Sequence, residues 1–181
     1  QLVRRSLVWG GPLAADEIVI TNSCTEALGL CLRAVTKPGD TVAVESPAYY
    51  LMLQLLETLG LKALEIPTDP RDGISVEALD LATRNGGVAA CLLVPNASNP
   101  LGSVMPDAKK RLLATLTAAR SVAVIEDDVY GDLHFGNQRP WPIKAFDTAG
   151  NVMLCASFSK SLSPALRIGF VAAGRHKAAV A

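Results

Sequence analysis

The stretch LCASFSKSLSPALRIGF, from Leu154 to Phe170, holds the pattern that decides the fold. It begins as an apolar strand, passes through serines and the single lysine Lys160, and returns to an apolar run after Arg167. A strand that is apolar on both faces is typical of a sheet covered by helices on both sides. Hydroxyl groups and cations directly after such a strand indicate a binding edge, because ligands gather beyond the carboxyl ends of parallel strands.

The same alternation extends along the whole chain. We predict strands at residues 17–20, 41–45, 62–67, 88–95, 122–128, 152–157 and 167–174, and helices at 25–40, 49–60, 75–83 and 105–120. Strands and helices that alternate at this spacing predict an α/β fold, namely a mostly parallel, doubly wound sheet with helices on both faces. Residues just after the strands are therefore the candidates for function.

Composition excludes several other classes of protein. The chain has 181 residues, of which 50% are hydrophobic, and its 17 basic and 17 acidic residues give no net charge. No basic surface for nucleic acid is expected from this balance, and no apolar run reaches the length of a membrane span. The four cysteines form no metal-binding pattern with the two histidines, so we expect no metal and four buried free thiols, as in a cytoplasmic protein.

Polar segments follow five of the predicted strands. They are TNSCTEA from residue 21, SPAYY from 46, PNASNPLG from 95, DDVYGDL from 127 and SFSK from 157. Together they bring hydroxyls, an aromatic ring, an amide, a carboxylate and a lysine to one edge of the sheet.

One part of this set suits a phosphate and an amine. Lys160 can be a general base, a phosphate partner or a residue that forms a Schiff base, and an amine attacks a carbonyl only after losing its proton. Ser157 and Arg167 suit a phosphate, because an arginine binds oxyanions through a fork of donors. The helix that opens at Cys24 and Thr25 adds backbone N–H groups and the positive end of a helix dipole.

The other part suits a flat heterocycle. Asp127 suits a protonated ring nitrogen, Tyr49 suits stacking on the ring, and Asn99 and Tyr130 suit hydrogen bonds to a ring oxygen. An aldehyde, a phosphate, a ring nitrogen and a phenolic oxygen on one molecule describe pyridoxal 5′-phosphate (PLP).

In these segments the sequence resembles the fold-type I, class I/II PLP-dependent aminotransferases. It is most similar to the aminotransferase-like domain of MocR-type regulators in the GntR family. The segments TNSCTEAL, VESPAYY, VPNASNPLG, IEDDVYGDLHF and SFSKSLSPALRIGF carry the resemblance, in the order of the family.

The resemblance implies a role for each candidate. Lys160 corresponds to the lysine that forms the Schiff base with the cofactor and acts as catalytic base, and Asp127 corresponds to the carboxylate on the ring nitrogen. Tyr130 and Asn99 correspond to the residues that contact the ring oxygen, and Tyr49 corresponds to the aromatic residue that stacks on the ring. The phosphate cup corresponds to Cys24, Thr25, Ser157 and Arg167. Ser23 and Ala165 depart from the family, which often has glycine there.

The resemblance also implies what surrounds the chain. It predicts that residues 1–181 form most of the large, cofactor-binding domain of a longer protein, without the small C-terminal domain. It further implies a cytoplasmic homodimer that acts on an amino acid and a 2-oxo acid, with no membrane partner.

The site leaves several functions open. The first is an aminotransferase, and the second is a transcriptional regulator that senses PLP or an amine and binds DNA through a domain outside this chain. A third is another reaction on the same cofactor, such as β-elimination or decarboxylation, and a fourth is a fragment without a working site. Single motifs do not decide, since EDD at 126–128 alone is typical of a solvated corner, and Cys24 can contribute its backbone rather than its sulfur.

Overall fold

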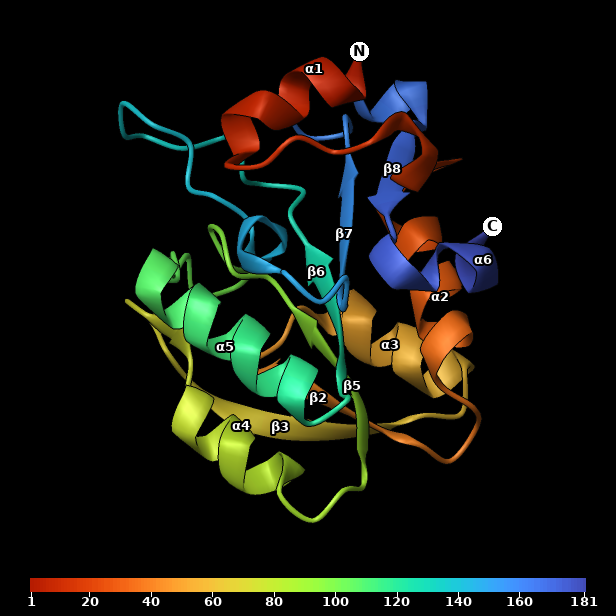
Figure 1. Ribbon diagram of the computed structural model, residues 1–181, viewed down its shortest axis with the longest axis vertical. Coiled ribbons are helices and arrows are strands. Elements are labelled where there is room, and N and C mark those ends of the chain that lie inside the picture. Colours follow the sequence, from red (N-terminus) through yellow and green to blue (C-terminus); the bar gives the residue numbers. More distant parts are fainter.

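The centre of the protein is one eight-stranded sheet, which a computed structural model describes together with all other residues from 1 to 181 (Figure 1). The order of the strands across the sheet is β1-β8-β7-β6-β5-β2-β3-β4. Their bounds are β1 Ile18–Thr21, β2 Thr41–Ser46, β3 Lys62–Asp69, β4 Gly73–Ile74, β5 Val88–Leu93, β6 Ala123–Asp127, β7 Val152–Ser157 and β8 Gly169–Ala172.

Six α-helices surround the sheet: α1 Leu2–Ser6, α2 Cys24–Val35, α3 Tyr50–Thr58, α4 Val76–Thr83, α5 Asp107–Ala119 and α6 Lys177–Val180. Serine caps begin two of them, because Ser23 Oγ accepts the N–H of Glu26 and Ser75 Oγ accepts the N–H of Ala78. The longest helix, α5, has 13 residues. None of the helices combines the length and the apolar character that crossing a bilayer requires.

The directions of the strands bring most carboxyl ends to one edge. β3, β2, β5, β6 and β7 are parallel neighbours, whereas β8 is antiparallel to both β7 and β1. β1 is therefore parallel to β7. The edge at which β1, β2, β5, β6 and β7 end is also the edge at which β8 begins.

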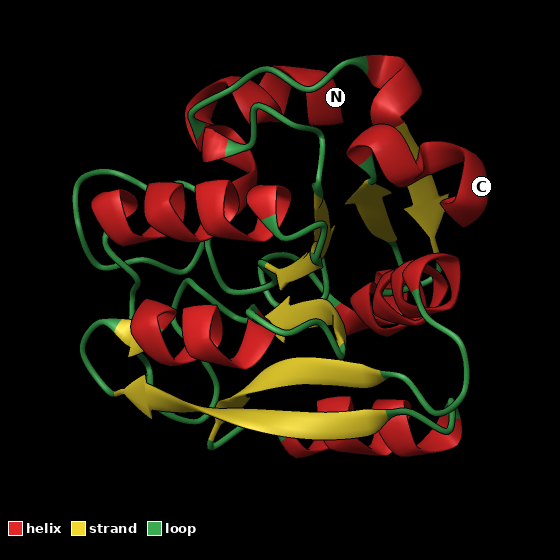
Figure 2. Ribbon diagram, turned by 60° about the horizontal axis from the view of Figure 1, so that its bottom comes forward, coloured by secondary structure: helices red, strands yellow, loops and turns green.

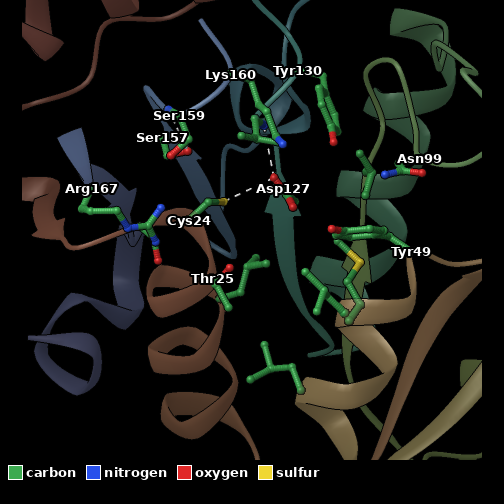
Figure 3. A pocket seen from close by; sticks show the side chains of 17 residues that line it. Cys24, Thr25, Tyr49, Asn99, Asp127, Tyr130, Ser157, Ser159, Lys160 and Arg167 are labelled. Carbon is green, nitrogen blue, oxygen red and sulfur yellow. Dashed lines mark hydrogen bonds between the residues drawn. The ribbon is translucent and has the colours of Figure 1, made fainter. Parts of the chain in front are cut away.

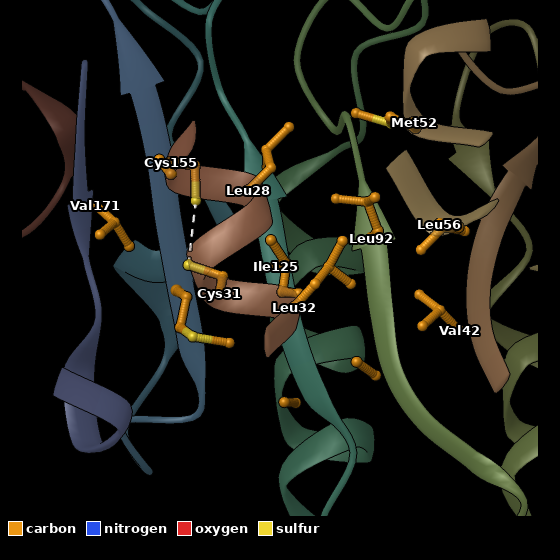
Figure 4. Packing of buried hydrophobic residues seen from close by; sticks show 14 of the residues in the cluster. Leu28, Cys31, Leu32, Val42, Met52, Leu56, Leu92, Ile125, Cys155 and Val171 are labelled. Atoms are coloured by element: carbon orange, nitrogen blue, oxygen red, sulfur yellow. Dashed lines mark hydrogen bonds between the residues drawn. The ribbon is translucent and has the colours of Figure 1, made fainter. Parts of the chain in front are cut away.

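Alternate side chains of β2 enter two of the three hydrophobic cores, one on each face of the sheet. Val42 and Val44 pack against α2 and α3 on one face, and Ala43 between them packs against α4 and α5 on the other. Figure 1 and the rotated view in Figure 2 show these helix pairs on opposite sides of the sheet. Figure 4 shows the first core, where Leu28 and Leu32 of α2 lie over the strands. Burial on both faces explains why the central strands β2, β5 and β7 are largely apolar, whereas β3 is mostly exposed.

The predicted fold class is confirmed, although several elements differ in detail. The strand at 73–74 was not predicted, because two residues are too few for a hydrophobic pattern. The helix predicted over 25–40 ends at Val35, ahead of Pro38, with the Oγ1 of Thr36 donating to the carbonyl of Leu32 at 2.7 Å. All four cysteines are buried and free, as expected.

Candidate functional site

A cavity lies at the shared strand edge, and every predicted site residue lines it (Figure 3). The residues are Cys24, Thr25, Tyr49, Asn99, Asp127, Tyr130, Ser157, Lys160 and Arg167. Figure 3 shows Asp127 between two groups of side chains. Ser157, Cys24, Thr25 and Arg167 lie on one side of Asp127, and Tyr49 and Asn99 lie on the other.

The first group collects donors for an anion. The cap of α2 uses Ser23, whose Oγ and carbonyl oxygen accept the amides of Glu26 and Ala27. The amides of Cys24 and Thr25 have no acceptor within the chain, as is usual in the first turn of a helix. Arg167 is exposed and forms no ion pair.

Close packing at Gly169 holds this donor group together. Gly169 is the first residue of β8, and it pairs with both Thr21 of β1 and Ser157 of β7. A Cβ atom added at Gly169 would lie 2.6 Å from the carbonyl oxygen of Ser23 and 2.8 Å from the amide nitrogen of Cys24. Only glycine at this position lets the start of α2 approach β8 so closely.

The second group consists of side chains with free polar ends. Tyr49 is the N-cap residue of α3, and Asn99 lies in the loop after β5. Tyr130 follows β6, and the Nζ of Lys160 lies 6.0 Å from the centre of its ring. The side chains of Asn99, Tyr130 and Lys160 form no hydrogen bond within the chain, so they are available to a ligand.

The three acidic residues at the end of β6 have three different environments. Glu126 is fully buried on the face opposite the cavity, where its oxygens accept the amides of Ile143 and Lys144 at 2.6 and 3.0 Å. Asp128 is also buried, and it accepts the side-chain amide of Asn96. Asp127 faces the cavity. The interpretation of EDD as a solvated corner is therefore wrong.

Asp127 combines burial with a strong acceptor. Burial raises its pKa to about 6, although hydrogen bonds from Cys24 and the amide of Val129 and the charge of Lys160 favour the ionised form. A carboxylate of this kind gains most from a cation placed beside it in the cavity.

A buried cation connects the loops that carry two of the site residues. Lys110 of α5 is 0% exposed, and its Nζ donates to Oδ1 of Asn96 at 2.7 Å and to the carbonyl of Trp141 at 2.5 Å. Asn96 lies three residues before Asn99 in the same loop. Its hydrogen-bond partner Asp128 lies two residues before Tyr130. Arg139 pairs with Asp128 from the other side. This network fixes the backbone from which Asn99 and Tyr130 reach the cavity.

The sequence did not indicate the apolar part of the lining. Leu28, Met52, Val94 and Val129 also border the cavity. Val94 directly follows β5 and Val129 lies two residues after β6, and this closeness to strand ends is the one sequence signal that points to them. The interpretation of Cys24 as a backbone contributor is incomplete, because its Sγ donates to Oδ1 of Asp127 at 3.3 Å.

A solved structure with the same fold defines the class of protein. An archaeal alanine:glyoxylate aminotransferase aligns with a TM-score of 0.90 and 30% identity, covering 99% of this chain and 46% of that chain. The fold is thus that of the fold-type I PLP-dependent transferases. Residues 10–181 match the family Aminotransferase class I and II, and the chain belongs to this family.

The curated relatives include regulators and enzymes. The uncharacterized HTH-type transcriptional regulator YjiR of Escherichia coli (strain K12) is 50% identical over 176 residues, which are 97% of this chain and 37% of that protein. Aromatic-amino-acid aminotransferase 1 of Thermococcus litoralis is 32% identical over 170 residues, which are 91% of this chain and 40% of that protein. The chain therefore spans well under half the length of these relatives.

Family membership supports PLP as the cofactor. The cavity fits this group, because it presents unbonded amides and Arg167 on one side, the free polar ends of Asn99 and Tyr130 on the other, and a buried carboxylate between them.

Proposed function

We propose that residues 1–181 form the large domain of a longer protein, which binds PLP through Lys160 and transfers amino groups between an amino acid and a 2-oxo acid. The observation that carries this proposal is the convergence of polar side chains from five strand ends and the start of β8 on one cavity, where those of Asn99, Lys160 and Arg167 have no partner within the chain. The buried charged groups Lys110 and Glu126, which lie outside the cavity, are by contrast hydrogen-bonded.

The residues at the start of α2 hold the anionic end of the cofactor. The amides of Cys24 and Thr25 donate hydrogen bonds to phosphate oxygens, and the guanidinium of Arg167 adds a charged fork of donors. Ser157 adds a hydroxyl from the end of β7.

The residues on the other side of the cavity orient the ring. Tyr49 stacks on its face, and Asn99 and Tyr130 donate to the ring oxygen. Asp127 accepts the N–H of the protonated ring nitrogen and keeps the proton there, since an anion beside a base raises the pKa of that base.

Lys160 has two tasks in this proposal. Its Nζ would hold the cofactor covalently in the resting protein. Once freed by the amine of a substrate, Nζ would be the general base that carries the proton from the α-carbon of the substrate to the cofactor carbon. The bound cofactor supplies an aldehyde that condenses with amines and a conjugated ring that withdraws electrons. Because the free Nζ forms no hydrogen bond within the chain, it can move between these tasks.

Replacing Lys160 tests this function in the full-length protein. Lys160→Ala is expected to abolish the absorbance band of the lysine-bound cofactor and the trapping of cofactor by borohydride, whereas Lys109→Ala, on α5 outside the cavity, keeps both. Mapping the trapped cofactor by peptide mass spectrometry identifies the lysine. Trapping on a different lysine, or retained trapping in Lys160→Ala, would refute the assignment.

A second candidate is a transcriptional regulator that uses the same cavity to sense PLP or an amine. The relatives at 50% and 49% identity are HTH-type regulators, which is the observation in its favour. DNA contact then belongs to a part of the protein outside this chain. Full conversion of the bound cofactor by an amino acid, followed by its regeneration by a 2-oxo acid over many cycles, supports the enzyme. A change in DNA binding on addition of PLP, without turnover, supports the regulator.

The partners follow from the same proposal. An amino acid and a 2-oxo acid are the small-molecule partners, and the family resemblance implies a homodimer in the cytoplasm. Sedimentation of the full-length protein checks the homodimer directly.

A further inference from the structure

The thiol of Cys24 contacts the carboxylate that lies at the centre of the cavity. Cys24 is the first residue of α2 and is 8% exposed. Its Sγ lies 3.3 Å from Oδ1 of Asp127, a residue 103 positions away in the sequence (Figure 3). Sulfur is a weak donor, but an ionised carboxylate is a strong acceptor, so the thiol hydrogen points to Asp127.

Two donors share the same oxygen of Asp127. The backbone amide of Val129 also donates to Oδ1, at 3.1 Å. Oδ2 of Asp127 forms no hydrogen bond within the chain, although the residue is only 7% exposed. Because this unbonded oxygen is not completely buried, it remains accessible from the cavity. Two hydrogen bonds therefore hold Oδ1 of the carboxylate, and Oδ2 is left to accept a hydrogen bond from a ligand in the cavity.

We propose that Cys24 is a positioning residue, whose thiol, together with the amide of Val129, occupies Oδ1 of Asp127 and leaves Oδ2 as the oxygen that receives the ring N–H of the cofactor. The inference rests on the proposed binding of PLP. It assigns to the side chain of Cys24 a task separate from the contact of its backbone amide with the phosphate.

The contact also bears on where the proton lies. A hydrogen bond from the thiol stabilises the charged form of Asp127, so the proton shared by the carboxylate and the ring nitrogen stays on the nitrogen. Without the thiol, the equilibrium between the ion pair and the neutral pair is expected to move toward the neutral pair by up to about tenfold, since one hydrogen bond to a charged group is lost. Lys160, Asp128 and Glu45, the other charged groups around Asp127, are unchanged by this substitution.

Three variants of the full-length protein distinguish the hydrogen bond of the Cys24 thiol from the effect of side-chain volume and from a general effect on α2. Cys24→Ala removes the donor, and Cys24→Ser keeps a donor of similar size. Cys31→Ala removes a thiol from the same buried face of α2, where Cys31 touches Cys155 and not Asp127. Each protein is loaded with PLP labelled with ¹⁵N in the ring, and the ring ¹⁵N shift is measured at neutral pH. We expect the resonance to move toward the unprotonated value in Cys24→Ala, and to stay near the wild-type value in Cys24→Ser and Cys31→Ala.

A measurement without cofactor keeps this inference distinct from the proposed function. The infrared S–H band of Cys24, isolated by subtracting the Cys24→Ala spectrum, is expected at low wavenumber in the cofactor-free protein. It should rise in Asp127→Asn, because an amide oxygen is a weaker acceptor than a carboxylate. A wild-type protein that takes up no PLP would refute the proposed function. The infrared band would still show whether the thiol of Cys24 donates a hydrogen bond to Asp127. An S–H band indifferent to Asp127→Asn, or an equal ¹⁵N shift in Cys24→Ala and wild type, would overturn the role of Cys24.

Discussion

The substitution Asp127→Asn is expected to stabilise the cofactor-free protein while it removes the proposed partner of the ring nitrogen. Asn is nearly isosteric with Asp, and its side-chain oxygen can still accept from Cys24 and from the amide of Val129. What changes is the charge, which Asp127 carries in a buried position.

The size of the effect follows from the pKa of Asp127, which burial raises from 3.8 to about 6. The folded protein therefore binds the proton more tightly than the unfolded chain, and this contribution to stability is lost as the pH rises from about 4 to about 6. The difference of about 2.2 pKa units, at 1.36 kcal/mol per unit, corresponds to about 3 kcal/mol. Asp127→Asn should thus gain up to about 3 kcal/mol relative to wild type above pH 6, and much less at pH 4.

Hydrogen exchange of peptides from β6 and β7 measures this difference in the cofactor-free full-length protein, because it reports the opening of this domain alone. Burial also raises the pKa values of Glu45 and Glu126, to about 7 and about 8, but both residues occur in both proteins, so subtraction removes most of their contribution.

Asp147→Asn is a control with the opposite sign. Burial opposes its ionisation, but the amides of Val152 and Asn151 and the ammonium of Lys144 outweigh burial and lower the pKa of Asp147. Asp147→Asn is therefore expected to destabilise at neutral pH, and its effect should shrink as the pH falls. Parallel pH profiles for wild type and Asp127→Asn between pH 4 and 7 would refute the reasoning about Asp127.

Three further substitutions test other parts of the site. Gly169→Ala should lower the free energy of unfolding by about 1–3 kcal/mol and weaken PLP binding, because the added Cβ displaces the start of α2; unchanged affinity in a titration would contradict the close packing. Arg167→Ala should weaken PLP binding by about tenfold or more without changing the stability of the cofactor-free protein, since Arg167 has no partner in the chain, and Arg33→Ala on the outside of α2 should change neither. Lys110→Met should cost about 1–3 kcal/mol by leaving the oxygen of Asn96 and a carbonyl unpaired, and a melting temperature at or above wild type would contradict this.

The fold was predictable because its strands are buried on both faces. Val42, Ala43 and Val44 are all apolar since one layer of helices covers each side, and this pattern is visible without coordinates. The hydrophobic pattern of the sequence did not show that β8 is antiparallel to its neighbours. The 11 residues 158–168 between β7 and β8 hold only a short 3₁₀ turn at Pro164–Leu166, which is too little for the crossover that a parallel strand needs.

The site was predictable where chain order alone places residues at the strand edge. Asp127 ends a parallel strand, and Asn99 and Lys160 come after parallel strands, so the sheet brings all three to one edge. Arg167 reaches the same edge for another reason, namely that β8 begins where its neighbours end. The bond between Cys24 and Asp127 was not predictable, because it depends on how closely Gly169 lets α2 approach.

The buried charge of Asp127 links cofactor binding to the stability of this domain. Without a ligand, ionised Asp127 has the thiol of Cys24 and one amide as its hydrogen-bond donors, and burial disfavours its charge. Under the proposed function, a protonated ring nitrogen beside Oδ2 removes this penalty, so part of the binding free energy appears as stability. An enzyme needs this coupling only to retain its cofactor. A regulator can use this coupling directly. If the domain is more stable with PLP bound than without it, the concentration of PLP sets the fraction of the protein in the more stable, cofactor-bound form. The same carboxylate therefore serves both candidate functions, and the pH profile of Asp127→Asn measures the strength of the coupling in either case.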